Sequence, residues 1–459
     1  MSGNDFIKDR RNPRHLSAGG PSADPLPVDL IPVAGGGLLH RRLFLKSGAV
    51  LGSAAALGAT GTFAFATYGE ESATEMPPMP PATPPWMKTP GGPFTNYGRP
   101  SPHEKKVIRW ITSNQSSPGN GVSWTPLQDL EGVITPNGLH FERHHNGVPA
   151  IIPDRHRLLI HGLVARPLTF MVDDLLRYPM MSRLCFVECG GNSNAGWNPR
   201  PLQARAGHLH GLASCSEWSG VALSVLLDEA RIDRSRAKWL YAEGADAAAV
   251  GASIPVAKAF DNAFVALYQN GERLRPENGY PMRLLIPGWE GVTHIKWLRR
   301  LKAVAQPMMS REETSKYTEL VPDGTARQFT FVMDAKSLIT APSLGKKMQG
   351  PGLYQITGLA WSGRGRIARV EVSADGGESW AEAELQEPIL PHCFTRFRIP
   401  WDWQGAPAVL QSRAIDETGS VQPTRQALMT ARGSHGYFHY NAIISWRVSD
   451  TGRVSHVYG

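Results

Sequence analysis

Short runs of alternating or continuous apolar residues, separated by glycine, proline and polar clusters, recur along most of this chain of 459 residues. Between residues 103 and 322 such runs predict strands at 157–161, 264–269 and 282–286, and periodic apolar positions predict short helices at 169–177 and 222–230. Long loops join these elements, and long loops of a compact domain commonly carry functional sites. We therefore expect an α+β domain over residues 103–322.

From about residue 323 the pattern changes to strands alone. The apolar runs lie at 354–361, 367–373, 379–385, 394–400 and 409–415, and the sequence DGG at 375–377 predicts a hairpin turn between two of them. Short strands at this regular spacing predict an immunoglobulin-like β-sandwich over residues 323–435.

The last residues, 436–459, form a C-terminal tail that is rich in aromatic side chains. Tyr437, Phe438, Tyr440 and Trp446 could dock a partner protein, although packing against the tail's own domain is the commoner outcome.

The N-terminal region has the pattern of an export signal. The sequence RRLFLK at 41–46 precedes a run of small and apolar residues that ends in AFA at 64–66, which predicts a cleaved twin-arginine signal peptide over residues 1–66. The run is too weakly apolar to favour a membrane anchor, so we expect no membrane span in the mature form. Twin-arginine signals direct folded proteins to the periplasm, chiefly proteins that receive their cofactor before transport. Residues 67–102 are too proline-rich for helix or inner strand and predict an extended arm.

Charge and cysteine content exclude several classes of protein. The formal charge of +8 falls to +5 when the seven Lys/Arg and four Asp/Glu of residues 1–66 are removed, and the chain has no basic run that would indicate nucleic-acid binding. The four cysteines are Cys185, Cys189, Cys215 and Cys393, and they form neither a CxxC pair nor a CxxCH motif. An iron–sulfur cluster would therefore lack ligands in this chain, and a c-type haem would lack its attachment cysteines.

Cys189 is the most informative of these cysteines. It lies in FVECGGN at 186–192, where a hydrophobic run stops at a thiol and turns on two glycines. A thiolate is a soft metal ligand, and the glycines would let a bulky cofactor approach the backbone. Taken alone, a buried structural cysteine would be the commoner interpretation. Cys185 is expected in the core, a pairing of Cys215 stays open in an oxidising compartment, and Cys393 has no assigned role.

Several motifs in a fixed order carry a family resemblance. VGASIP at 250–255, GYPMRL at 279–284, PG at 287–288 and HIKWL at 294–298 follow FERHH at 141–145 and the Cys189 segment. In this order and spacing the chain resembles the sulfite oxidase family of molybdenum enzymes over roughly residues 100–435. Within the family it is most similar to the sulfane dehydrogenase subunits of thiosulfate-oxidising systems. The resemblance implies a molybdenum–molybdopterin cofactor and a sandwich that serves for dimerisation.

The resemblance also implies roles for individual residues. Cys189 would be the metal ligand, and Arg283 and Lys296 would contact the phosphate and the pterin. The other cofactor contacts that it implies are Phe141, His144, His145, Asp246, His294 and Ile295. Asn278 stands where the family often has a histidine, which weakens that one contact.

The expected substrate pocket departs from the family pattern. Arg143 and Arg432 match arginines that neutralise sulfite, Trp218 matches a tryptophan that lines the pocket, and Tyr317 is expected near the metal. The arginine that should closely follow the thiolate is replaced by Asn194. One positive charge fewer weakens selection for a small dianion and favours a different sulfur substrate.

We therefore expect an enzyme that oxidises sulfane sulfur on a carrier protein to a sulfonate with water-derived oxygen. Its electrons would pass to a c-type cytochrome subunit, and two copies of the chain would dimerise within a heterotetramer. A periplasmic sulfite dehydrogenase that oxidises free sulfite is the nearest alternative, and a non-catalytic partner protein with the same fold is an alternative of another class. The insertion at 197–211 could shape a mouth for a protein substrate or be an ordinary surface loop.

Overall fold

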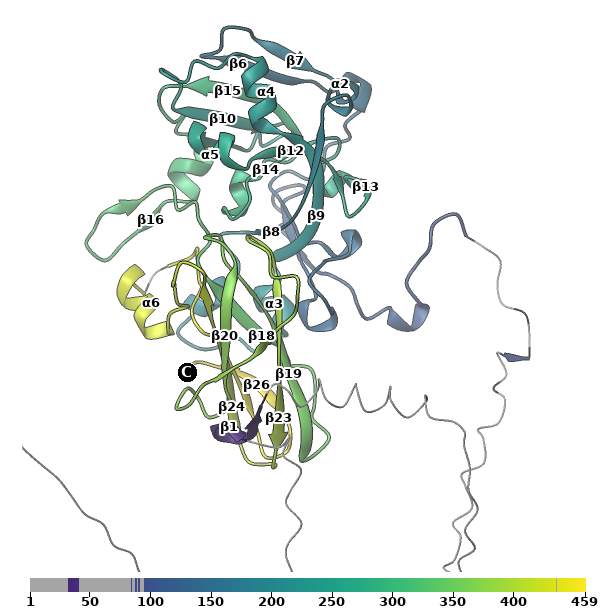
Figure 1. The fold of residues 1–459 in the computed structure, drawn as a ribbon, viewed down its shortest axis with the longest axis vertical. Coiled ribbons are helices and arrows are strands. Elements are labelled where there is room, and N and C mark those ends of the chain that lie inside the picture. Colours follow the sequence, from purple (N-terminus) through teal and green to yellow (C-terminus); the bar gives the residue numbers. More distant parts are fainter. Residues whose placement is uncertain (1–31, 41–83, 85–86, 89, 91–94, 435) are drawn as a thin grey trace, which may run out of the picture.

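The computed structural model describes residues 32–40, 84, 87–88, 90, 95–434 and 436–459. In Figure 1 these residues form two stacked parts, an upper part that carries several short helices and a lower part built of long strands. The twin arginines, the run up to residue 66 and most of the proline-rich stretch lie outside the described residues, so the predictions made for them stay predictions.

The upper part is built on a five-stranded sheet with the order β11-β10-β15-β6-β7, in which only β15 and β6 run parallel. The strands are β11 (Gly251–Pro255), β10 (Trp239–Gly244), β15 (Leu298–Val304), β6 (Leu158–Gly162) and β7 (Leu168–Phe170). The helices are α2 (Val172–Leu176), α4 (Leu223–Glu229) and α5 (Val256–Asp261). Apolar side chains of the sheet and of these helices form one continuous core.

A second sheet, with the order β13-β12-β9-β8, lies between this core and the sandwich. Its strands are β13 (Glu272–Arg273), β12 (Phe264–Gln269), β9 (Ala213–Ala222) and β8 (Met180–Glu188), and β14 (Arg283–Leu285) pairs with β12 beside β13. Side chains alternate across β8 and β9, so that Phe186 and Cys215 pack into the sandwich core while Cys185 and Trp218 pack on the other side. These two strands are one wall shared by two cores, and Cys189 follows the wall directly.

The lower part is a sandwich of two antiparallel sheets. The first has the order β1-β2-β23-β19-β18, and its long strands are β23 (Thr395–Trp403), β19 (Gly352–Trp361) and β18 (Lys336–Ala341), with β22 (Glu384–Leu385) paired to β23. The second has the order β21-β20-β24-β25-β26, formed by β21 (Ala381–Glu382), β20 (Ile367–Ser373), β24 (Ala408–Asp416), β25 (Ser445–Val448) and β26 (Val454–Val457). The helix α6 (Arg425–Arg432) follows β24, and the Thr424 hydroxyl caps it by accepting a hydrogen bond from the Ala427 amide.

The α+β part and the immunoglobulin-like sandwich predicted from the sequence are both present. The predicted strand at 264–269 coincides with β12, but the helix predicted at 169–177 begins as β7 and becomes the shorter α2. The single strand predicted at 379–385 is two strands, because the chain crosses between the sheets after β21.

The C-terminal tail is part of the sandwich. Residues 436–459 include β25 and β26, which extend the second sheet, and Trp446 is fully buried there and donates a hydrogen bond to the Ile339 carbonyl at 3.1 Å. Trp446 therefore serves the tail's own domain, whereas the Phe438 ring lies 4.8 Å from that of Tyr317 and the Tyr437 side chain is 58% exposed.

Part of the predicted signal peptide is folded. Residues 32–39, which lie within the predicted signal peptide, form β1 (Pro32–Ala34), the turn η1 (Gly35–Gly37) and β2 (Leu38–Leu39) against the sandwich. Figure 1 shows this segment in purple at the lower end of the sandwich. Leu38 and Leu39 are buried there, and cleavage after residue 66 stays a prediction.

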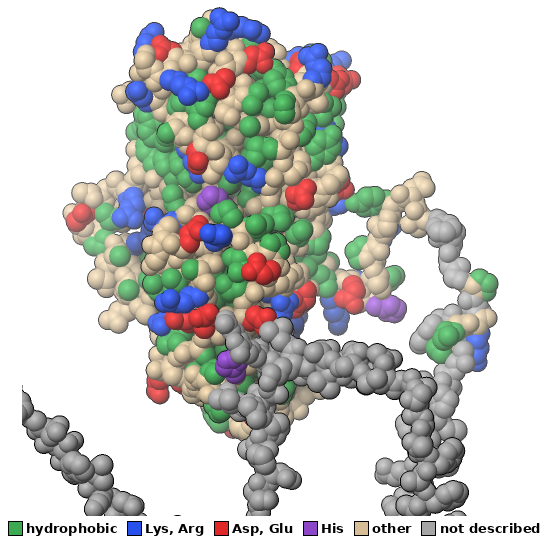
Figure 2. Space-filling model, viewed as in Figure 1, with side chains coloured by type: hydrophobic (Ala, Val, Ile, Leu, Met, Phe, Trp, Pro, Cys, Tyr) green, Lys and Arg blue, Asp and Glu red, His purple; other side chains and the backbone are tan. Residues whose placement is uncertain are grey.

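Smaller elements complete the surroundings of the site. A three-stranded sheet of β3 (Trp110–Ser113), β4 (Gly121–Trp124) and β5 (Glu142–His144) supplies FERHH, and the hairpin of β16 (Glu319–Leu320) and β17 (Ala326–Arg327) projects from the upper part. Among the described residues, no helix has the length and apolar character to cross a membrane. Lys and Arg side chains lie interspersed with Asp and Glu on the face shown in Figure 2.

Candidate active site

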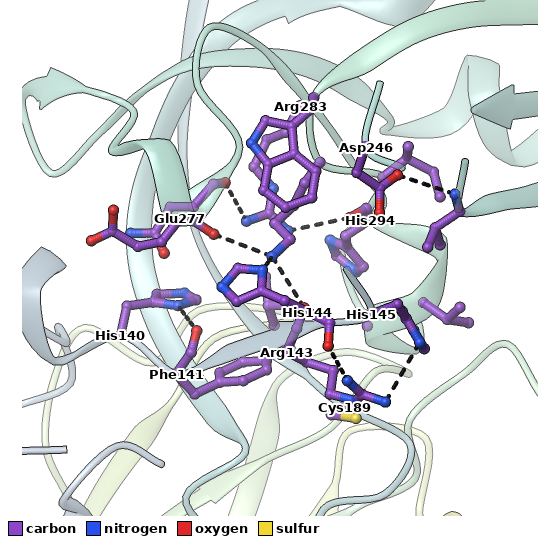
Figure 3. A pocket seen from close by; sticks show the side chains of 18 of the residues that line it. His140, Phe141, Arg143, His144, His145, Cys189, Asp246, Glu277, Arg283 and His294 are labelled. Atoms are coloured by element: carbon purple, nitrogen blue, oxygen red, sulfur yellow. Dashed lines mark hydrogen bonds between the residues drawn. The ribbon is translucent and has the colours of Figure 1, made fainter. Parts of the chain in front are cut away.

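One cavity brings together most of the residues selected from the sequence. It encloses about 750 Å³, its open mouth included, which is in the range of small-molecule sites. Eleven of the thirteen predicted site residues line it: Phe141, Arg143, His144, His145, Cys189, Asp246, Arg283, His294, Ile295, Lys296 and Tyr317. They come from β5, the end of β8, the β10–β11 connection, β14 and the segments before β15 and β16, as Figure 3 shows for those that it labels.

Cys189 is held by the backbone of the turn that follows β8. Its amide donates to the Leu212 carbonyl at 2.9 Å, and its carbonyl accepts from the Asn192 amide at 2.8 Å. A Cβ atom at position 190 would collide with the Glu290 carboxylate, so a larger residue there would displace that carboxylate. Burial raises the pKa of the Cys189 thiol to about 11, and a bound metal cation would favour the thiolate.

Arg283 is a buried cation on the other side of the cavity from Cys189 (Figure 3), and the half-buried Lys296 lines the same cavity. The Arg283 guanidinium donates to the carbonyls of Asn278 and His294 at 2.9 and 3.3 Å, and its Nε has no hydrogen-bond partner. Burial lowers the pKa of Arg283 to about 10.

The Lys296 ammonium is the second cation of the cavity. It donates to the Arg143 and Glu277 carbonyls at 3.1 and 3.2 Å and to His144 Nδ1 at 2.8 Å. Burial and the charge of Arg283 lower the pKa of Lys296. Among the described residues neither cation forms an ion pair with a carboxylate. Buried positive charge that only neutral dipoles satisfy fits an anionic ligand such as a phosphate.

Two histidines supply neutral polar edges to the same cavity. His144 Nδ1 accepts a hydrogen bond from the Lys296 ammonium, so its Nε2 carries the proton and donates a hydrogen bond to the Glu142 carboxylate at 2.6 Å. Burial lowers the pKa of His144, and burial together with Arg143 lowers that of His145 to about 4. Both imidazoles are uncharged near neutral pH and can hydrogen-bond the donors and acceptors of a heterocycle.

Arg143 and Tyr317 lie nearer to Cys189. Arg143 donates to the Asn120 side chain at 2.9 Å and to the His144 carbonyl, and it contacts no carboxylate among the described residues. Tyr317 follows the helical turn η10 (Glu312–Lys316), and its ring centre lies 4.8 Å from that of Phe438. Burial raises the pKa of Tyr317, so its phenol remains a proton donor.

Two predicted residues do not line the cavity. Trp218 is fully buried on β9, where its indole NH donates to the Cys185 carbonyl at 3.2 Å and its ring lies 4.9 Å from the Arg283 guanidinium. It therefore packs behind Arg283 and is not a wall of the substrate pocket. Arg432 forms an ion pair with Glu319 at 2.5 Å, so its charge is compensated before any substrate arrives.

The insertion at 197–211, which separates Cys189 from Trp218, contains a buried helix. The helix α3 (Ala206–His210) places Ala206 and Leu209 in the sandwich core, and the Gly207 amide donates to the Gln128 side chain at 2.7 Å. The C-terminal half of the insertion is therefore packed against the sandwich core, whereas most of residues 198–205 are exposed, so a surface loop or a mouth stays open for that part.

Several residues around the cavity were missed from the sequence. His140 lines the cavity with an unpartnered Nε2, and its position directly before the FERHH motif was the available signal. Glu188 is buried beside Cys189 and receives hydrogen bonds from Lys336 at 3.0 Å and from Trp361 at 2.6 Å, both in the sandwich. No local pattern links Glu188 to residues so distant in the chain.

Comparisons with known proteins agree with this chemistry. A model of the oxidoreductase molybdopterin-binding domain matches residues 145–312, and a model of the Mo-co oxidoreductase dimerisation domain matches residues 327–446. The crystal structure of the sulfane dehydrogenase SoxCD from Paracoccus pantotrophus is 45% identical, with a TM-score of 0.80, and the match covers 82% of this chain and 98% of that chain.

Enzymes with other substrates are also similar. Mitochondrial sulfite oxidase from Rattus norvegicus is 33% identical over 322 residues, which are 64% of this chain and 58% of that protein. The NADH nitrate reductase of Ulva prolifera is 30% identical over 64% of this chain and 38% of its own length. This chain thus spans less than two thirds of these relatives. The two domain models and the near-complete match to a solved structure agree with the thiol and cations of the cavity. The chain belongs to the sulfite oxidase family of molybdopterin oxidoreductases.

Proposed function

We propose that this chain is the molybdopterin subunit of a sulfane dehydrogenase, which oxidises sulfane sulfur on a carrier protein to the sulfonate level. One observation carries the proposal: Cys189, Arg283 and Lys296 meet in one cavity of a chain that is 45% identical to the SoxCD structure over 98% of that chain.

The cavity fits molybdopterin because it offers a thiol together with cations that have no carboxylate partner among the described residues. Cys189 would bind the metal, and Arg283 and Lys296 would hold the phosphate and pterin. The further contacts would come from Phe141, His144, His145, Asp246, His294 and Ile295. The bound cofactor supplies a metal centre that takes up electrons in pairs and transfers water-derived oxygen to sulfur.

The chain's own residues would orient the substrate and compensate its charge. Arg143 lines the cavity beside Cys189 without a carboxylate partner among the described residues, so its guanidinium would stabilise negative charge that develops on the sulfur-bound oxygens. Tyr317, held protonated by burial, would donate a hydrogen bond to a reacting oxygen.

The distribution of charge supports protein-bound sulfane sulfur over free sulfite. Asn194 does not line the cavity and Arg432 is paired with Glu319, so Arg143 is the one predicted substrate arginine that the described cavity contains without a carboxylate partner. A single such cation selects weakly for a dianion. The similarity to sulfite oxidases keeps free sulfite as the second candidate.

Partners and location follow from the same set of features. The cysteines form no haem-attachment motif, so we infer that electrons pass to a separate c-type cytochrome subunit. The match to a dimerisation domain supports a dimer of this chain within a heterotetramer. The twin arginines at 41–42 support export to the periplasm.

The test compares two substrates on one enzyme. The chain, produced with its signal in a host that makes molybdopterin and purified with its cytochrome, is given sulfite or a persulfide on a carrier-protein cysteine, and cytochrome reduction is followed. We expect a much higher kcat/KM with the persulfide, and no reduction by the Cys189→Ser variant. Efficient sulfite oxidation without persulfide oxidation would replace the proposal with a sulfite dehydrogenase. Molybdenum-free protein after the same preparation would indicate the non-catalytic alternative.

A further inference from the structure

The sandwich binds a short segment of the same chain that precedes the twin arginines. We call residues 32–40 the docking segment; it ends immediately before Arg41 and Arg42. Leu38 of β2 pairs with Trp401 of β23, and Figure 1 shows the segment lying along the lower end of the sandwich.

Three consecutive glycines, Gly35 to Gly37, allow the docking segment to lie directly against the backbone and side chains of the sandwich. A Cβ atom at Gly35 would collide with the Asp375 carboxylate, and one at Gly37 would collide with the Asp402 carbonyl. At Gly36 a Cβ atom would lie 2.8 Å from the Ala374 Cβ. Gly36 and Gly37 also have positive φ values of 69° and 89°, which favour glycine.

Polar and apolar contacts fix the segment in place. The Trp401 indole NH donates to the Gly36 carbonyl at 2.6 Å, and the Gly35 amide donates to the Ser379 hydroxyl at 2.7 Å. Leu38 is fully buried and belongs to the main core of the sandwich, and Leu39 is 4% exposed. Apolar burial and specific hydrogen bonds thus act together.

The receiving surface exists only in the folded sandwich. Ala374 and Asp375 follow β20 in the second sheet, whereas Trp401 and Asp402 belong to β23 in the first sheet. These pairs come together when both sheets have formed and packed. An unfolded chain would offer the docking segment no equivalent surface.

We propose that the docking segment is a folding-dependent ligand of the sandwich: it docks only when both sheets have formed and packed, and it thereby couples export of the precursor to folding. The docking rests on the contacts alone, whereas its role in export also rests on the twin-arginine signal predicted from the sequence. Removal of residues 1–66 would then uncover the edge of β23 at Trp401.

Hydrogen exchange of the full-length precursor tests the docking. Leu38→Asp is compared with Val33→Asp, which makes the same change of charge at a side chain that is 39% exposed. We expect the amides of residues 35–39 and 401–403 to exchange ~10-fold or more faster in the Leu38→Asp precursor than in the wild type and the Val33→Asp control. Gly37→Val should behave like Leu38→Asp. Equal exchange in all four proteins would overturn the proposal.

Export of the same precursors tests the role. We expect Leu38→Asp and Gly37→Val to lower the exported fraction several-fold relative to Val33→Asp in cells with a functional twin-arginine pathway. If exchange rises in these variants but export does not fall, the coupling to export is refuted. Activity of the purified holoenzyme is a separate measurement, so either result leaves the proposed reaction to its own test.

Discussion

The ion pair between Glu188 and Lys336 gives the sharpest test of how the sandwich supports the site. Lys336 Nζ lies 3.0 Å from Glu188 Oε1, and the two side chains are 2% and 1% exposed. The Glu188 carboxylate also accepts from Asn192 and Trp361, and Lys336 also donates to Ser193 at 2.7 Å. Because Glu188 directly precedes Cys189 and Ser193 lies in the following turn, this network spans both ends of the segment that presents the thiol.

The change Lys336→Met leaves a buried carboxylate without its cation. Removing one partner of a buried pair costs about 3–5 kcal/mol. The hydrogen bonds from Asn192 and Trp361 to the carboxylate remain, so we expect Lys336→Met to lower the free energy of unfolding by about 3 kcal/mol, near the lower end of this range. The double change Lys336→Met with Glu188→Gln removes the uncompensated charge and should recover part of this loss.

The assay is urea unfolding of the full chain followed by tryptophan fluorescence, with the alkylation rate of Cys189 in cofactor-free protein as a second readout. Arg364→Met is the control, because Arg364 and Asp334 form a pair at 2.8 Å whose side chains are 45% and 29% exposed, and exposed pairs contribute about 1 kcal/mol or less. We expect Lys336→Met alone to be strongly destabilised and to alkylate Cys189 faster. Equal stability and alkylation in the two single variants would refute the reasoning.

Three further predictions concern the cavity and its rim. Cys189→Ser should abolish turnover even in protein that still contains molybdenum by elemental analysis, whereas Cys185→Ser, in the buried part of the preceding strand β8, should stay active. Arg283→Met should lower pterin retention about 10-fold or more, because a charged hydrogen-bonding group is lost; the pterin fluorescence released on denaturation measures this, and unchanged retention would contradict the assignment. Burial alone would lower the pKa of His439, but the Glu290 carboxylate at 3.5 Å outweighs it and the pKa is raised. The stability that this pair contributes should be full below the ordinary histidine value, about 6.5, and lost as pH rises through the raised pKa; a wild-type stability profile parallel to that of His439→Gln over this range would contradict it.

The sequence predicted those features that depend on local pattern. The strand at 264–269 and the helix at 222–230 have periodic apolar positions, and the motifs from FERHH to HIKWL supplied most of the cavity. The residue types within each motif and the spacing of the motifs along the chain were sufficient to predict these cavity residues.

What the sequence could not predict depends on contacts between distant segments. The charge of Arg432 is compensated by Glu319, 113 residues away, and no local pattern shows that pair. Trp218 has the residue type of a pocket wall, but the alternation of β9 turns it into the core behind Arg283. The break between β21 and β22 arises from a crossing between sheets, which alternation along one strand cannot reveal.

The wall formed by β8 and β9 has a consequence for how this molecule can change. Phe186 on one face and Cys185 on the other belong to different cores, yet they are neighbours in one strand. A shift of this strand that improves packing in the sandwich necessarily moves the thiol-bearing turn that follows it. The sandwich therefore cannot be replaced by another domain without affecting the site, because its packing helps to position Cys189. Substitutions in the sandwich core and in the active-site part are constrained to accommodate each other.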